Sequence, residues 1–111
     1  MNRYRTYAET ACGYVLASPT GEVNLGFLGH ELTFTSNEDF IDFADTLECQ
    51  TGMESVPVIR LVVYDLDITV SGIDFIALQK MIATASSEAR WWAGYQNINV
   101  AEMGFRQIKA R

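Results

Sequence analysis

The strongest constraint on the fold of this chain is an internal repeat. Residues 36–43 read Ser-Asn-Glu-Asp-Phe-Ile-Asp-Phe, and residues 71–78 read Ser-Gly-Ile-Asp-Phe-Ile-Ala-Leu, so Ser, Asp, Phe and Ile recur at the same spacing. A strand-like segment precedes each copy, at residues 32–35 and 66–69. Recurring segments are typical of one structural unit used twice. We therefore predict two β–α pseudo-repeats, each a strand followed by a helix.

Both predicted helices begin with a capping serine. The side chains of Ser36 and Ser71 can accept a hydrogen bond from a backbone N–H of the first turn. Asp39 and Asp74 follow three residues later, in the acidic position of a capping box. The first helix then repeats apolar residues at i, i+3, i+4 and i+7, which predicts an amphipathic helix. Its core face is Phe40, Phe43, Ala44 and Leu47.

The second helix should be longer, reaching about Ala93, where Gly94 would end it. Its other sides are also apolar or small, which favours more than one covered face. The segment 97–108 leaves two alternatives open, a last strand or a short terminal helix. The predicted core face of the second helix is Phe75, Leu78, Ile82, Ala85 and Ala89.

The segments before the first helix predict an antiparallel meander. Turn residues separate apolar runs at 13–18, 23–27 and 31–35, and residues 3–8 alternate weakly like an edge strand. The β-branched run 58–63 is typical of a strand covered on both faces.

That run either continues or turns back at Asp65 into a strand over 66–70. Together the elements predict one α+β domain over residues 1–111, with a largely antiparallel sheet and two helices on one face.

The charge distribution argues against nucleic acid as a partner. The net charge is −6, and residues 6–59 hold nine acids but no Lys or Arg. Phosphate backbones and anionic membrane surfaces repel such a chain. No apolar run approaches the roughly 18 residues of a membrane helix, and the first nine residues lack the apolar stretch of a signal peptide. We therefore expect a cytoplasmic protein that binds neither nucleic acid nor membrane.

Two sets of residues are candidates for a protein interface. The first is an acidic stripe on the first helix, which is either a solvated face or a surface for a basic partner. The second lies on the low-charge side of the second helix, where exposed apolar residues would mark a partner site and Trp is a favoured anchor. Because most homo-oligomers are two-fold dimers, we expect a homodimer. The candidates are Glu38, Asp42, Asp45, Met81, Trp91 and Trp92.

One segment carries a possible catalytic motif. Residues 61–70, Leu-Val-Val-Tyr-Asp-Leu-Asp-Ile-Thr-Val, resemble the first motif of the haloacid dehalogenase phosphatases. The resemblance implies Asp65 as nucleophile and Asp67 as acid/base, with Mg²⁺ nearby. The chain departs from the family at Ile68, where Gly is common, and lacks the paired downstream acids. We instead expect Asp65 and Asp67 to be exposed strand residues without a catalytic role, and the protein not to be an enzyme.

The cysteines and the single histidine suggest no metal or cofactor site. Cys12 and Cys49 lack metal-site spacing, and we expect two small buried side chains, with their pairing left open. A lone His30 excludes a site built on two histidines, and its place beside Gly29 favours a solvated turn. A Cys–His dyad is an alternative without local support.

A second resemblance rests on the strand and helix residues of the first half. Gly13-Tyr14-Val15, Gly26-Phe27, Leu32 with Phe34, and Phe40 with Phe43 resemble a small, uncharacterised bacterial family known mainly from Bacteroidota. It implies no activity. Our leading hypothesis is a non-catalytic protein-interaction or regulatory module that forms a homodimer. The alternatives are a small acidic inhibitor or immunity-type protein that blocks a basic site, and a magnesium-dependent phosphatase.

Overall fold

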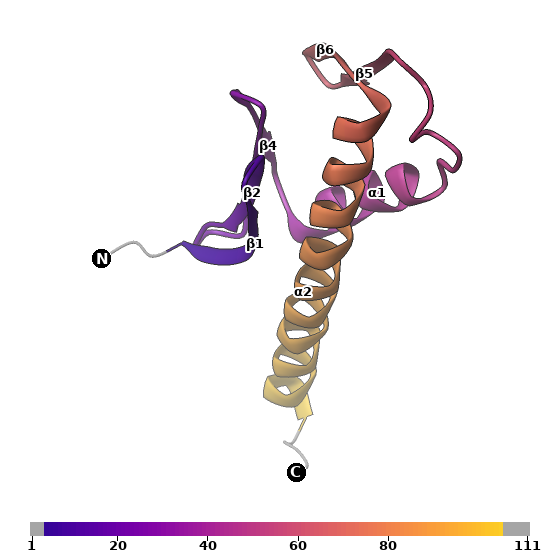
Figure 1. Ribbon diagram of the computed structural model, residues 1–111. Helices are drawn as coiled ribbons and strands as arrows, with labels where there is room; N and C mark the ends of the chain where they lie inside the picture. Colours follow the sequence, from indigo (N-terminus) through magenta and orange to yellow (C-terminus); the bar gives the residue numbers. More distant parts are fainter. Residues whose placement is uncertain (1–3, 106–111) are drawn as a thin grey trace.

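Six strands and two helices make up the computed structural model, which describes residues 4–105, with side chains as far as Gly94 (Figure 1). Four strands form an antiparallel sheet in the order β1-β2-β3-β4, and two more form a separate hairpin. The predicted α+β class is confirmed. The elements are β1 Arg5–Thr10, β2 Gly13–Ala17, β3 Val23–Phe27, β4 His30–Phe34, α1 Asn37–Glu48, β5 Ile59–Val63, β6 Leu66–Val70 and α2 Gly72–Phe105.

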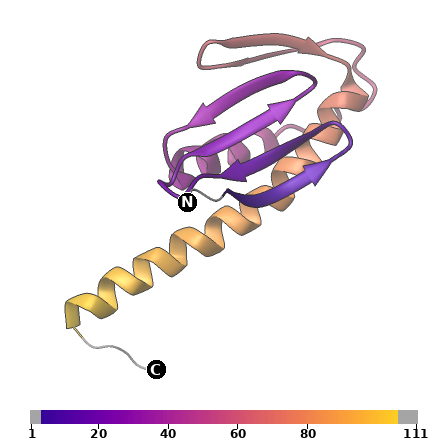
Figure 2. The ribbon, with the colours of Figure 1, turned by 90° about the vertical axis from the view of Figure 1, so that its left-hand side faces the viewer.

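Both helices cover the same face of the four-stranded sheet (Figure 2). Side chains alternate across a strand, and the buried set on β2, β3 and β4 points to the helices. The helix faces predicted from the sequence are all buried. The sheet contributes Val15, Ala17, Val23, Leu25, Phe27, Leu32 and Phe34 to this core.

The two predicted helix starts share the same cap. Ser36 Oγ accepts a hydrogen bond from the backbone N–H of Asp39, and Ser71 Oγ from that of Asp74, at 3.1 Å in both cases. Phe40 and Phe75 are both buried, as expected. The preceding strands differ, because β4 belongs to the four-stranded sheet and β6 pairs with β5. The local helix start therefore recurs, whereas a repeat of the whole β–α unit stays a prediction.

The β-branched run forms a hairpin in which the chain turns back at Tyr64 and Asp65, between the paired residues Val63 and Leu66. The prediction that this strand is covered on both faces is wrong. Arg60 and Val62 are exposed, and the alternate residues of β5 are half-buried. Only one face of the hairpin packs against the core, so a run rich in β-branched residues did not mark a central strand.

Helix α2 does not stop at Gly94 but continues to Phe105, so the predicted end is wrong. One glycine inside a helix costs only about 1 kcal/mol relative to Ala, which is too little to end a long helix by itself. Residues 97–105 are therefore helical and not a strand, and residues 106–108 lie outside the described residues. Figure 2 shows this last part of α2 running beyond the sheet.

A side chain from α2 caps the end of α1. The last turn of α1 has no basic residue, and the last carbonyls of a helix need donors from elsewhere. Gln79 Nε2 donates to the carbonyl oxygens of Leu47 at 2.7 Å and Gln50 at 2.8 Å. This contact fixes α1 against α2 beside the groove described next.

Candidate functional site

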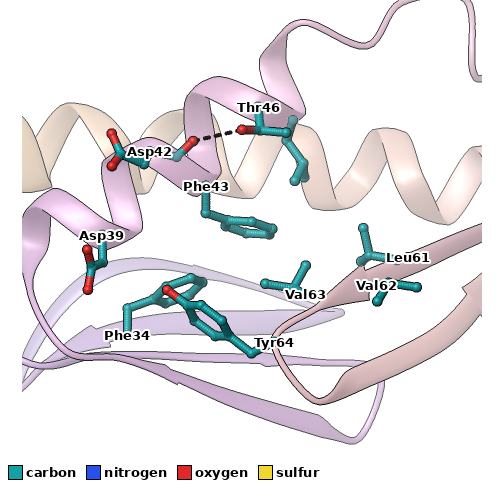
Figure 3. A pocket seen from close by; sticks show the side chains of 10 residues that line it. Phe34, Asp39, Asp42, Phe43, Thr46, Leu61, Val62, Val63 and Tyr64 are labelled. Atoms are coloured by element: carbon teal, nitrogen blue, oxygen red, sulfur yellow. Dashed lines mark hydrogen bonds between the residues drawn. The ribbon is translucent and has the colours of Figure 1, made fainter.

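A groove separates α1 from the β5–β6 hairpin, with the end of β4 at its base (Figure 3). Its volume is about 350 Å³, within the size range of ligand-binding clefts. We call it the α1–hairpin groove. The residues that line it are Phe34, Asp39, Asp42, Phe43, Thr46, Leu47, Leu61, Val62, Val63 and Tyr64.

An aromatic cluster forms the floor of the groove. Phe34 is fully buried, and its ring centroid lies 5.1 Å from that of Phe43 and 5.4 Å from that of Phe40. The ring of Tyr64 reaches back to Phe34, at a centroid distance of 5.7 Å. Because these residues come from β4, α1 and the hairpin turn, Phe34 holds together the three elements that shape the groove.

The α1 side of the groove carries two carboxylates. Thr35 Oγ1 donates to Asp39 Oδ2 at 2.5 Å, which orients that side chain. Thr46 Oγ1 donates to the backbone carbonyl of Asp42 at 3.0 Å, and the Asp42 carboxylate makes no ion pair with the described side chains of residues 4–94. No Lys or Arg is among the described residues that line the groove. A cleft lined by one sign of charge attracts the opposite sign, so this site favours cations.

The hairpin side presents apolar surface to solvent. Val62 is 58% exposed and Tyr64 is 64% exposed. Tyr64 has a φ of 53°, a backbone conformation that is uncommon for a bulky residue. Strained residues of this kind concentrate at binding sites and turns. The conformation places the Tyr64 ring over Phe34 at the mouth of the groove (Figure 3).

The structure divides the acidic stripe predicted on the first helix. Glu38 and Asp42 are exposed, but only Asp42 lines the groove. Asp45 forms an ion pair with Arg90 of α2, and both side chains are about half exposed. Exposed pairs contribute only about 0–1 kcal/mol, yet this one removes an unpaired carboxylate. Asp39, which the stripe did not include, lines the groove instead.

The structure also alters the second set of predicted interface residues, the one on the second helix. Met81 is 1% exposed, so its prediction as an interface residue is wrong. The end of β1 covers this side of α2, because the Thr10 hydroxyl lies 3.5 Å from the Met81 sulfur. Trp91 is exposed, whereas Trp92 is half-buried with the Arg5 guanidinium 3.6 Å above its ring. The two indole rings meet edge to face at 4.6 Å.

The two aspartates of the phosphatase-like motif lie on the hairpin and not in the groove. Asp65 is exposed in the turn. Arg60 binds Asp67 through two hydrogen bonds, Nε to Oδ1 at 2.9 Å and Nη2 to Oδ2 at 2.5 Å. These bonds and the Arg60 charge lower the pKa of the Asp67 carboxyl despite some desolvation. A general acid needs a pKa close to the working pH, so Asp67 is poorly suited to that role. The absence of phosphatase activity stays a prediction.

The two thiols and the histidine form no recognisable centre. Cys49 is exposed at the end of α1, so its prediction as a buried side chain is wrong, and both thiols are free. Cys12 and His30 line a shallow depression of about 390 Å³, but the Cys12 sulfur lies 3.2 Å from Thr10 Oγ1. Among the side chains that the structure describes, those of residues 4–94, no three His, Cys, Asp or Glu converge to hold a metal ion.

Sequence reasoning missed the groove itself, because Phe34, Val62 and Tyr64 are far apart in the chain. The one local signal is the exposed position of Tyr64 in a two-residue turn.

Neither helix of the described chain combines the length and hydrophobicity needed to cross a membrane. Searches among protein families, curated proteins and solved structures find no match to this chain. Neither resemblance noted in the sequence gains support from them.

Proposed function

We propose that this chain is a non-catalytic protein-interaction module whose α1–hairpin groove binds a partner segment. The segment would insert an apolar side chain beside Val62 and Tyr64, above the buried Phe34, and place a Lys or Arg beside Asp39 and Asp42. The observation that carries this proposal is the combination of an apolar floor, two rim carboxylates and a volume of about 350 Å³. Apolar clefts with a few directing polar groups are the usual form of a recognition site.

The exposed apolar residues of the hairpin support a macromolecular partner. Val62 and Tyr64 flank the groove, and both are more than half exposed. Exposed apolar residues beside a groove are expected at a protein interface. The alternative of an inhibitor that acts through the acidic stripe is less well supported, because Arg90 already pairs with Asp45.

Selection from a random peptide library should enrich peptides that carry Lys or Arg beside a large apolar residue. Asp42→Lys replaces attraction with repulsion at the rim and should weaken binding of the selected peptides about two- to fivefold. Val62→Asp should also weaken them, because it places charge on the apolar side. Fluorescence polarisation with a labelled peptide measures both effects.

Glu22→Lys is the matched control, because Glu22 is exposed in the turn before β3 and does not line the groove. It changes the net charge by the same amount as Asp42→Lys. Equal loss of affinity in the two variants would assign the effect to net charge and refute the groove. Binding should also weaken with added salt, which screens exposed charges.

A second copy of the chain is a second candidate partner. The observation that favours it is the continuation of α2 beyond the sheet (Figure 2). Residues 95–105 include a single charged residue, Glu102. Long helices of low charge are stable when a partner covers more than one face. We propose a two-fold dimer in which the extended part of α2 and Trp91 contact the other copy.

Sedimentation velocity of the full chain at micromolar concentrations should show a dimer that dissociates on dilution. Trp91→Ala should raise the dimer dissociation constant about tenfold, since buried Trp side chains often contribute more than 1 kcal/mol to an interface. Tyr64→Ala is the control: it removes an exposed aromatic at the groove and should leave the dimer unchanged. A monomer at all concentrations would refute self-association without affecting the groove.

A further inference from the structure

A second cavity, remote from the groove, lies where β1, the β2–β3 turn, the start of α1 and α2 meet. Its volume is about 130 Å³. Four of its lining residues carry the inference: Arg5, Tyr7, Asn37 and Trp92. The proposed function uses none of them.

Asn37 leaves a buried donor without a partner. It is 7% exposed, and its Oδ1 accepts a hydrogen bond of 2.8 Å from the Tyr7 hydroxyl. Because the hydroxyl donates to Oδ1, the amide Nδ2 is the other end of the group, and it makes no hydrogen bond to any side chain described, residues 4–94, or to the described backbone. Buried polar groups nearly always have a partner. The Asn37 Nδ2 group at this cavity is therefore a hydrogen-bond donor that a ligand with an acceptor atom would satisfy.

Arg5 supplies a positive charge at the same place. Its guanidinium carbon lies 3.6 Å from the centroid of the Trp92 ring, and the side chain is exposed to solvent at the cavity. It forms no ion pair with a carboxylate of the described chain. Burial raises the pKa of the Tyr7 phenol, while Arg5 lowers it through its charge and a hydrogen bond. The Arg5 charge thus acts on the hydroxyl that binds Asn37, and Glu88, the acid that also acts on Tyr7, has the weakest effect.

The start of α1 adds a third favourable element. Asn37 is the first residue of a 12-residue helix, and the N-terminal end of a helix carries a partial positive charge. Ser18 supplies no further donor, since its hydroxyl already bonds Thr20 at 3.0 Å and accepts from the Glu22 N–H at 3.0 Å. Recognition therefore depends on Arg5 and Asn37.

The charge and the volume of the cavity restrict the class of ligand that can bind there. A cavity of 130 Å³ has room for roughly four water molecules, which suits a small ion and excludes a nucleotide. One guanidinium matches one negative charge, and its planar fork matches a carboxylate. We propose that this cavity binds a small carboxylate, which accepts hydrogen bonds from the Arg5 guanidinium and from Asn37 Nδ2.

Acetate titrated into the full-length protein, at constant ionic strength with chloride as reference, tests the proposal. The side-chain amide resonance of Asn37 and the indole N–H resonance of Trp92 should shift in a saturable way. Arg5→Gln should weaken acetate binding about tenfold or more, because a hydrogen bond to a charged group is lost. Arg60→Gln, on the hairpin, should leave it unchanged.

Asn37→Asp is a second variant that keeps an acceptor for Tyr7. It replaces the free donor with a carboxylate, so the acetate-dependent shift of the Trp92 indole should disappear while the fold is retained. Shifts that follow chloride as closely as acetate would refute the site. Equal acetate affinity in Arg5→Gln, or tighter binding of inorganic phosphate than of acetate, would also contradict the proposal.

Discussion

Replacing Gly72 with alanine should lower the free energy of unfolding by about 3 kcal/mol, as expected for an overpacked site that cannot relax. Gly72 opens α2 directly beneath the loop that follows α1. A Cβ there would lie 2.1 Å from the carbonyl oxygen of Met53 and 2.6 Å from that of Val56. The Gly72 N–H also donates to Val56 O at 2.8 Å. The loop must therefore move, and this hydrogen bond would be strained. Urea unfolding followed by circular dichroism measures the loss.

Gly94→Ala is the matched control in the same helix. A Cβ at Gly94 would meet nothing within 4 Å, and Ala is favoured over Gly inside a helix by up to about 1 kcal/mol. This variant should therefore be as stable as the original chain or slightly more stable. Similar destabilisation in both variants would show that the close approach at Gly72 does not limit stability.

Phe34→Ala should cost about 3–5 kcal/mol, the range found when a buried aromatic side chain is truncated. Phe34 is completely buried and packs against Phe40, Phe43 and Tyr64. Its removal leaves a cavity where the sheet, α1 and the hairpin meet. Thermal unfolding by calorimetry measures the effect, and the groove floor should be lost with it.

Phe34→Leu separates stability from recognition at the groove. Leucine keeps most of the apolar volume, so we expect a loss of only about 1–2 kcal/mol and a folded chain. Peptides selected on the groove should still bind this variant more weakly, because the floor has lost its ring. Unchanged peptide affinity in Phe34→Leu would contradict the place of Phe34 beneath the bound segment.

Tyr64→Ala should be nearly neutral for stability, because its side chain is 64% exposed and exposed substitutions usually change stability by less than about 0.5 kcal/mol. It should nevertheless weaken peptide binding at the groove. A large loss of stability instead would mean that the Tyr64 ring acts mainly as a cover for Phe34.

Local signals in the sequence predicted the helix starts and faces. The caps at Ser36 and Ser71 depend on atoms three residues apart, and the buried faces of both helices follow from helical spacing. The antiparallel meander followed from its turns for the same reason. Each of these features is set by neighbours along the chain, so no knowledge of the tertiary structure was needed.

The sequence did not predict the features that depend on residues distant in the chain. Met81 is buried on the side of α2 that faces the end of β1, where the Thr10 hydroxyl lies 3.5 Å from its sulfur. Asp45 is paired because Arg90 lies across the helix interface. The length of α2 was mispredicted for a different reason. The unfavourable helix propensity of Gly94 is small compared with the stability of the helix around it.

The candidate site was decided by tertiary structure alone. Phe34, Asp42 and Tyr64 lie on three elements that meet only after folding, and Arg5 meets Trp92 across most of the chain. The sequence by itself determined which residues cap, turn and face a core, because those preferences act over a few residues. Only the tertiary structure decided which carboxylates stay unpaired and which apolar residues stay exposed, because both depend on what packs against them.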